Sequence, residues 1–273
     1  MHFDIFTLFP GYFSGPFGAS ILKRAIAEEK LSIGLHDMRD WSEDKHRKVD
    51  DYPFGGGAGM VIKAEPVARA LEDVLNFAVG VSAPPCPVVW LTPQGRPFNQ
   101  SVAQELAEHP RVALLCGHYE GLDERLVETC VTDEISLGDF ILTGGEPAAA
   151  VLVDAVARLL PDVLRNEHSA RVESFSNGLL EAPHYTRPAT WRGIGVPDVL
   201  LSGNHAHIEI WRFREGLRRT LARRPELLER APLDREWTRS ERKVLQEVLE
   251  EFEAARLAEG EPEVSRQEKQ DES

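Results

Sequence analysis

Residues 112–121 read VALLCGHYEG, an apolar run that passes directly into a loop bounded by two glycines. A short apolar run that stops at a turn signal is typical of a buried strand. The same pattern occurs twice more, where VVWL at 88–91 runs into TPQG at 92–95 and EISL at 134–137 runs into GDFILTGGEP at 138–147. Helical spacing of apolar residues follows the three runs, at 99–108, 123–129 and 147–160. This alternation predicts an α/β domain with a mainly parallel sheet.

The chain before residue 88 fits the same architecture. Its apolar patterns predict strands at 2–8 and 31–36 and helices at 20–30 and 65–78. Pro66 falls in the first turn of the last of these helices, where its missing N–H breaks no hydrogen bond.

The loops after the three later strands are a candidate ligand site. Open α/β sheets bind ligands at the carboxyl ends of their strands, and glycines let backbone amides approach a small molecule closely. Each loop alone could be an ordinary tight turn. Three in succession favour a ligand site.

Composition and charge limit the class of protein. The 273 residues include 42% hydrophobic residues, enough for a packed core, and carry a formal net charge of −14. No window approaches the roughly 18 consecutive apolar residues of a membrane span, and MHFDIFTLFPGYF lacks the features of a signal peptide. The three cysteines show no C-x-x-C spacing and no disulfide framework. We therefore expect a mature, cytoplasmic protein, and the net charge at first sight argues against a nucleic-acid partner.

The pattern changes after residue 164. Residues 165–177 are polar and predict a flexible linker, and helical patterns at 205–224 and 240–257 predict a helical domain over 178–255. An acidic tail, 256–273, follows. Residues 212–243 hold eleven basic and six acidic residues, a local net charge of +5. Such a segment suits contact with phosphates, although interleaved arginine and glutamate also form ion-paired helical faces.

Several common chemistries are not supported. GGGAG at 55–59 lacks the last glycine of a dinucleotide fingerprint and the Lys-Ser/Thr of a phosphate-binding loop. His205 and His207 would point to different sides of a helix, and there is no H-E-x-x-H, so no protein-built metal site is expected. No G-x-S-x-G elbow is present. Hydride, phosphoryl and acyl transfer are therefore all disfavoured.

Six segments resemble one family, the bacterial tRNA (guanine-37-N1)-methyltransferases of the trefoil-knot (SPOUT) class. They are HRKVDDYPFGGGAGM (46–60), LTPQGRPFNQ (91–100), CGHYEGLDER (116–125), SLGDFILTGGE (136–146), GLLEAPHYTRP (178–188) and VLLSGNHAHIEIWR (199–212). The resemblance covers roughly residues 1–250 and implies a knotted, mainly parallel α/β domain over 1–164, followed by the smaller helical domain. It also implies a homodimer whose active sites are shared between the subunits.

The resemblance implies an S-adenosylmethionine site in the three loops described above. The implied cofactor-binding residues are Leu91, Thr92, Pro93, Gln94, Gly117, Tyr119, Glu120, Leu137, Gly138, Asp139, Phe140, Ile141, Leu142, Gly144 and Gly145. The alternative for Tyr119 and Glu120 is packing within their own loop.

The implied activity is methyl transfer to N1 of guanine-37, next to the anticodon. By resemblance, Glu173 is the general base, although the family has Asp there, and Arg158 stabilises charge on the guanine. Glu173 could instead be a solvated acid of the linker, and Arg158 could be a surface arginine whose stem lies along an apolar helix. The resemblance also implies that Mg²⁺ assists the methyl transfer without a set of protein ligands that holds it stably.

The implied tRNA-binding residues are Asp50, Gly59, Ser169, His184 and Arg187. Asp50 could instead be a loop or cap acid, and His184 and Arg187 could fix the domain junction. Two other functions stay open: a knotted methyltransferase acting on a ribose 2′-hydroxyl, and a binding module without activity.

Overall fold

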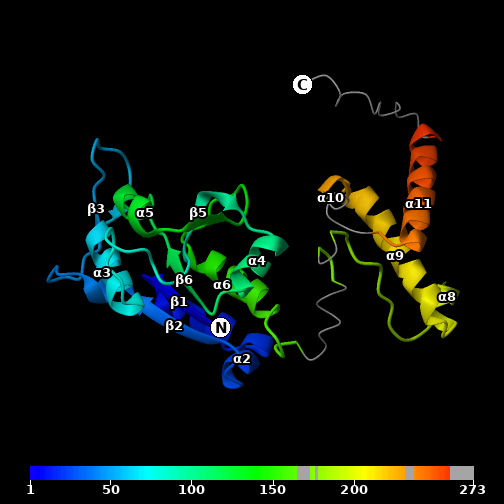
Figure 1. The fold of residues 1–273 in the computed structure, drawn as a ribbon, viewed down its shortest axis with the longest axis horizontal. Coiled ribbons are helices and arrows are strands. Elements are labelled where there is room, and N and C mark those ends of the chain that lie inside the picture. Colours follow the sequence, from blue (N-terminus) through cyan, green and yellow to red (C-terminus); the bar gives the residue numbers. More distant parts are fainter. Residues whose placement is uncertain (165–172, 176–177, 231–236, 259–273) are drawn as a thin grey trace. The chain divides into compact units, whose positions relative to one another are not determined.

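The computed structural model describes residues 1–164, 173–175, 178–230 and 237–258. The chain divides into two units, Met1–Glu167 and His168–Ser273 (Figure 1).

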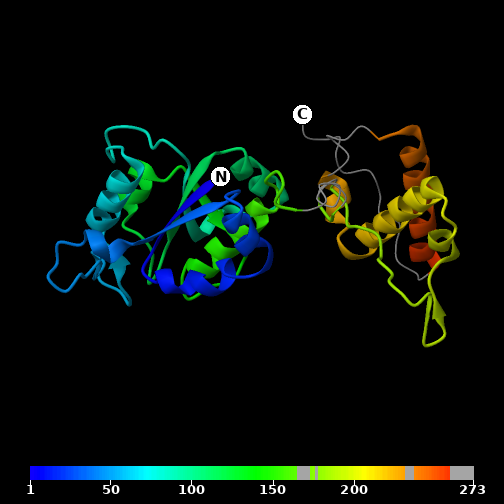
Figure 2. The ribbon, with the colours of Figure 1, turned by 90° about the horizontal axis from the view of Figure 1, so that it is seen from below.

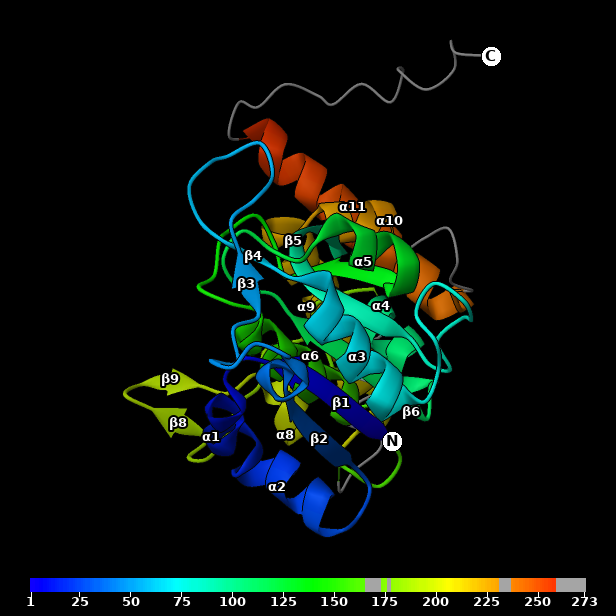
Figure 3. The ribbon, with the colours of Figure 1, turned by 90° about the vertical axis from the view of Figure 1, so that its left-hand side faces the viewer.

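The first unit is built on a five-stranded sheet in which every pair of neighbours is parallel. The strand order is β2-β1-β6-β5-β7. The strands are β1 (His2–Thr7), β2 (Ser32–Asp37), β5 (Val88–Pro97), β6 (Arg111–Cys116) and β7 (Asp133–Ser136). Figure 3 shows β1 and β2 side by side at the edge of this sheet. The predicted parallel α/β architecture is confirmed.

Helices cover both faces of the sheet (Figure 2). They are α1 (Ser14–Phe17), α2 (Ser20–Ala27), α3 (Ala64–Leu75), α4 (Gln100–Ala107), α5 (Glu124–Cys130) and α6 (Glu146–Ala157), with short 3-10 turns at Pro10–Phe13 and Met38–Trp41. Alternate strand residues face opposite cores, so Leu114 packs with α2, α4 and α6, whereas Leu115 packs with α3 and α5. Asn99 and Asp123 cap α4 and α5 by accepting hydrogen bonds from backbone amides.

One strand runs further than the sequence predicts. The turn signals in TPQG predict that the strand beginning at Val88 ends at Leu91, but β5 continues to Pro97. Its pairing with β7 shifts register, because Leu91 and Arg96 both lie opposite Ile135. Residues 92–95 therefore loop out of the ladder. Gly95 makes this possible, since a Cβ there would overlap the backbone of residues 134 and 135.

A small antiparallel pair lies beside the sheet. It consists of β3 (Asp50–Asp51) and β4 (Val61–Ile62), which flank the glycine-rich loop. Ile62 also forms a bridge with Leu122, which ties this pair to the loop after β6.

The second unit is mainly helical. It contains α8 (Asp198–Leu201), α9 (His205–Arg223), α10 (Glu226–Arg230), α11 (Arg239–Ala258) and a hairpin of β8 (Thr190–Trp191) and β9 (Ile194–Gly195), which projects from the unit in Figures 2 and 3. Its core is the cluster Leu179, Leu217, Val244 and Val248, which joins α9 to α11. Throughout the described part of the chain, no helix is long and apolar enough to cross a membrane.

Candidate active site

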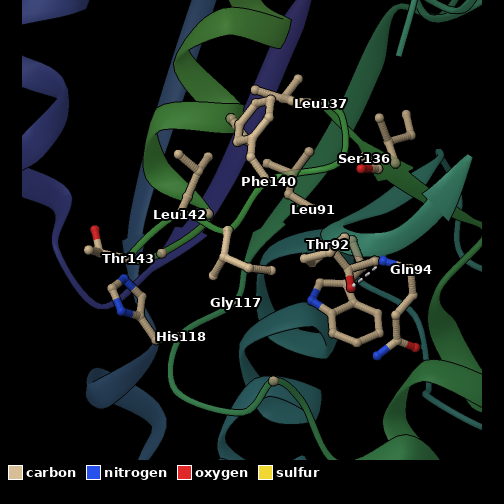
Figure 4. Close-up of a pocket in the computed structure, with 18 of the residues that line it drawn as sticks. Leu91, Thr92, Gln94, Gly117, His118, Ser136, Leu137, Phe140, Leu142 and Thr143 are labelled. Carbon is tan, nitrogen blue, oxygen red and sulfur yellow. Dashed lines mark hydrogen bonds between the residues drawn. The ribbon is translucent and has the colours of Figure 1, made fainter. Parts of the chain in front are cut away.

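The three loops predicted as a ligand site meet around one cavity of about 400 Å³ in the first unit (Figure 4). Fourteen of the fifteen predicted cofactor-binding residues line it. The exception is Asp139, which is exposed and is absent from the lining. Seven further residues line the cavity that were not among the predicted cofactor-binding residues, although four of them (His118, Gly121, Ser136 and Thr143) lie within the quoted motifs: Trp90, His118, Gly121, Ile135, Ser136, Thr143 and Ala148.

Glycines allow two of these loops to touch. The N–H of Gly145 donates to the carbonyl of Gly117 at 2.9 Å. A Cβ on Gly145 would lie 2.7 Å from Cys116 Cα and 2.9 Å from Gly117 N. A Cβ on Gly144 would overlap the His118 imidazole. The cavity wall therefore depends on the absence of side chains at these two positions.

The buried carboxylate of Glu146 connects the same loops to the end of β1 through hydrogen bonds. Glu146 is 3% exposed and accepts a hydrogen bond from Thr7 Oγ1 at 2.5 Å. Its other carboxylate oxygen lies 2.7 Å from His118 Nε2. These contacts join the end of β1, the loop after β6 and the start of α6. Sequence analysis missed them because the three residues lie far apart in the chain.

The lining is poor in charge. It contains neither lysine nor arginine, and Glu120 is its one acidic residue. A carboxylate without a competing cation suits a ligand that carries positive charge. Burial raises the pKa of the Cys116 thiol well above its usual range, and the nearby Glu146 charge acts in the same direction. Cys116 therefore stays protonated and is not a nucleophile.

The glycine-rich loop ends at the rim of this cavity. Gly59 has φ +89°, and a Cβ there would overlap the Glu120 carboxylate. The N–H of Glu120 donates to the carbonyl of Met60 at 3.0 Å. Asp50 pairs with Ile62 on the neighbouring strand. Two residues predicted to bind tRNA thus lie on the segment that borders the predicted cofactor site.

The other predicted residues are distributed over both units. Arg158 is the half-buried C-cap of α6. Glu173 is half-buried in the second unit. His184, in the same unit, lies 3.0 Å from a carboxylate oxygen of Glu181 through Nε2. Arg187 is exposed. Ser169 lies outside the described residues. Among the side chains that are described, no cluster of three or more His, Cys, Asp or Glu could hold a metal ion.

Comparisons with known proteins identify the family. The family model described as tRNA (Guanine-1)-methyltransferase TrmD matches residues 1–230. Together with the parallel sheet, this match defines a methyltransferase of the trefoil-knot (SPOUT) class. A tRNA (guanine-N(1)-)-methyltransferase of Dehalococcoides mccartyi is 55% identical over 92% of this chain and 98% of its own length. One from Chloroflexus aggregans is 60% identical over 85% of this chain and 89% of its own length. The chain belongs to the tRNA (guanine-1)-methyltransferase family.

Proposed function

We propose that the protein transfers a methyl group from S-adenosylmethionine to N1 of guanine-37 in tRNA, next to the anticodon. The observation that carries this proposal is the cavity where three glycine-bearing loops meet, with the loop of Gly59 at its rim. Guanine N1 bears a proton, so a base must remove that proton before N1 can act as a nucleophile.

The cavity fits S-adenosylmethionine on three grounds. Its volume of about 400 Å³ falls within the usual range for small-molecule sites. The glycine positions leave space that a Cβ would fill, and the lining offers Glu120 but no cation. When bound, S-adenosylmethionine supplies an activated methyl group on a sulfonium. Gly117, Leu137 and Leu142 would hold it, together with the other residues predicted above.

Glu173 is the proposed general base. Its carboxylate would accept the N1 proton, and Arg158 would stabilise negative charge that develops on guanine O6. Glu keeps the acid–base chemistry of the family's Asp but is longer by one methylene. Asp50 and Gly59 would shape the pocket for the target guanine, and His184, Arg187 and Ser169 would contact the tRNA.

The arginines of α9 support contact between residues 178–255 and the tRNA backbone. Arg214 and Arg218 face α11, where they pair with Glu247 and Glu251. Arg212, Arg219 and Arg223 share one face of the helix, because they are seven and four residues apart. This face is opposite to that of Arg214 and Arg218, since Arg212 and Arg214 are separated by about 200° around the helix. We call Arg212, Arg219 and Arg223 the arginine stripe. It makes no ion pair with any side chain that the structure describes, so its charges are available for phosphates.

Replacing all three residues of the arginine stripe by Gln is expected to lower the affinity for tRNA and also to make that affinity less dependent on salt. Each lost phosphate contact lowers the slope of log K against log salt by about 0.7–0.9, so the slope should fall by about 2–3. Filter binding at several salt concentrations measures it. Arg218→Gln is the matched control, because Glu215 and Glu251 already neutralise this charge. An unchanged slope in the triple variant would remove the stripe from the tRNA interface.

The oligomeric state and the cellular location are also part of the proposal. We infer a homodimer with active sites shared between subunits, in the cytoplasm, with residues 165–177 as the linker. Mg²⁺ would be held partly by substrate and water. Gel filtration tests the dimer: an active species near the 30.5 kDa of one chain would contradict the shared active site.

Unmodified tRNA transcripts that carry guanine or adenine at position 37 test the position of the target. Transfer of a labelled methyl group should occur to the first and not to the second. Equal labelling of both transcripts would place the modified nucleotide elsewhere.

A further inference from the structure

Trp90 is a cavity residue that neither the motifs nor the proposed function assigns. It lies on β5 directly before Leu91 and is 4% exposed. Its ring packs in the cluster that contains Leu115 and Leu122, on the face of the sheet covered by α3 and α5. Its position in an apolar strand predicts an ordinary core residue, but it also lines the cavity.

The indole N–H of Trp90 has no acceptor. Among the described residues, Nε1 is the one buried side-chain nitrogen or oxygen atom without a hydrogen-bond partner. Tryptophan can only donate at this atom. A buried donor that loses water and gains no acceptor costs free energy, and buried tryptophans usually find a partner for this group.

Gly117 leaves space beside this buried donor. A Cβ on Gly117 would lie 3.0 Å from Trp90 Nε1, and a Cβ on Gly121 would lie 3.3 Å from Trp90 Cζ2. Both glycines line the same cavity. The backbone thus passes over the indole without a side chain that could cover Nε1.

We propose that Trp90 Nε1 donates a hydrogen bond to an acceptor atom of the cofactor, so that Trp90 is a further cofactor-binding residue. This inference rests on the proposed function, because it takes S-adenosylmethionine as the occupant of the cavity. The part of the lining that this chain supplies contains no lysine or arginine to meet the cofactor's carboxylate, so the donors it offers there are neutral N–H groups. The ribose and adenine offer further acceptors.

Nuclear magnetic resonance of the indole groups tests the inference directly. The chain has five tryptophans, and Phe variants made one at a time assign their N–H signals. Saturation with S-adenosylhomocysteine should move the Trp90 signal downfield more than the other four signals. 5′-Methylthioadenosine, which lacks the amino-acid part, distinguishes the acceptors: a shift with both ligands places the acceptor on the nucleoside, and a shift with S-adenosylhomocysteine alone places it on the amino-acid part.

Calorimetry of the same ligand gives a second readout. Trp90→Phe should weaken S-adenosylhomocysteine binding about tenfold. Trp41→Phe is the control, since the Trp41 indole already donates to Asp73 at 3.1 Å. Binding of S-adenosylhomocysteine that leaves the Trp90 signal in place would overturn this inference and keep the proposed cofactor. No binding at all would overturn both.

Discussion

Replacing Glu173 by Gln is expected to abolish methyl transfer while S-adenosylhomocysteine binding survives. Gln preserves the size of the side chain and its ability to form hydrogen bonds but cannot accept the N1 proton. Removal of a general base typically costs about 10²–10⁴ in rate. Single-turnover methylation of unmodified tRNA at saturating cofactor measures the rate, and calorimetry measures cofactor binding.

Two further variants sharpen this result. Glu173→Asp retains the carboxylate and should recover part of the rate, because only the reach of the side chain changes. Glu209→Gln removes an exposed carboxylate from α9 of the same unit and should leave the rate unchanged. Near-normal turnover in Glu173→Gln would remove Glu173 as the base and leave the cofactor site intact.

Replacing Gly145 by Ala is expected to disrupt the cavity itself. The new Cβ would lie 2.7 Å from Cys116 Cα and 2.9 Å from Gly117 N. Both atoms are backbone, so neither can move aside by a change of rotamer. Overpacking of this kind costs about 1–3 kcal/mol, and we expect a loss of stability near 3 kcal/mol. Because residue 117 forms the cavity wall, S-adenosylhomocysteine binding should be lost as well.

Gly15→Ala is the matched control for this substitution. A Cβ on Gly15 would meet no atom within 4 Å, so its effect on stability should stay within about 0.5 kcal/mol. Urea unfolding measures both variants. If Gly145→Ala unfolds at the same urea concentration as the unchanged protein and binds the ligand normally, the contact between the two loops does not shape the cavity.

Local patterns were sufficient to predict the elements that build the site. VALLCGHYEG predicts a buried strand followed by an open loop, and β6 ends at Cys116 directly before Gly117. A continuous apolar run and the turn signal that follows it are properties of short segments. The same local signals led to the wrong end for β5. Pro93 and Gly95 are turn signals, but the strand resumes because β7, far along the chain, offers a second stretch of ladder.

Two of the features that sequence analysis missed depend on non-local contacts. The hydrogen bonds of Glu146 to Thr7 and His118 span 139 and 28 residues. Trp90 occupies an apolar position of a strand, and only the approach of Gly117 leaves its N–H without a partner. No periodicity or spacing encodes such contacts.

The net charge of the whole chain likewise does not describe how charge is distributed over the structure. A value of −14 argues against nucleic acid only if charge is spread evenly. The arginine stripe is a local exception, because the charges on the other side of α9 are neutralised within the unit. Attraction to tRNA is therefore expected to be local and strongly dependent on salt.

Mass spectrometry of the nucleosides from unmodified tRNA, incubated with the protein and S-adenosylmethionine and then digested, tests the proposed function most directly. We expect 1-methylguanosine, located at position 37 when the digest is mapped to oligonucleotides. A ribose-methylated nucleoside would contradict the proposed function in favour of a different knotted methyltransferase. The absence of any methylated product would instead indicate a binding module without activity.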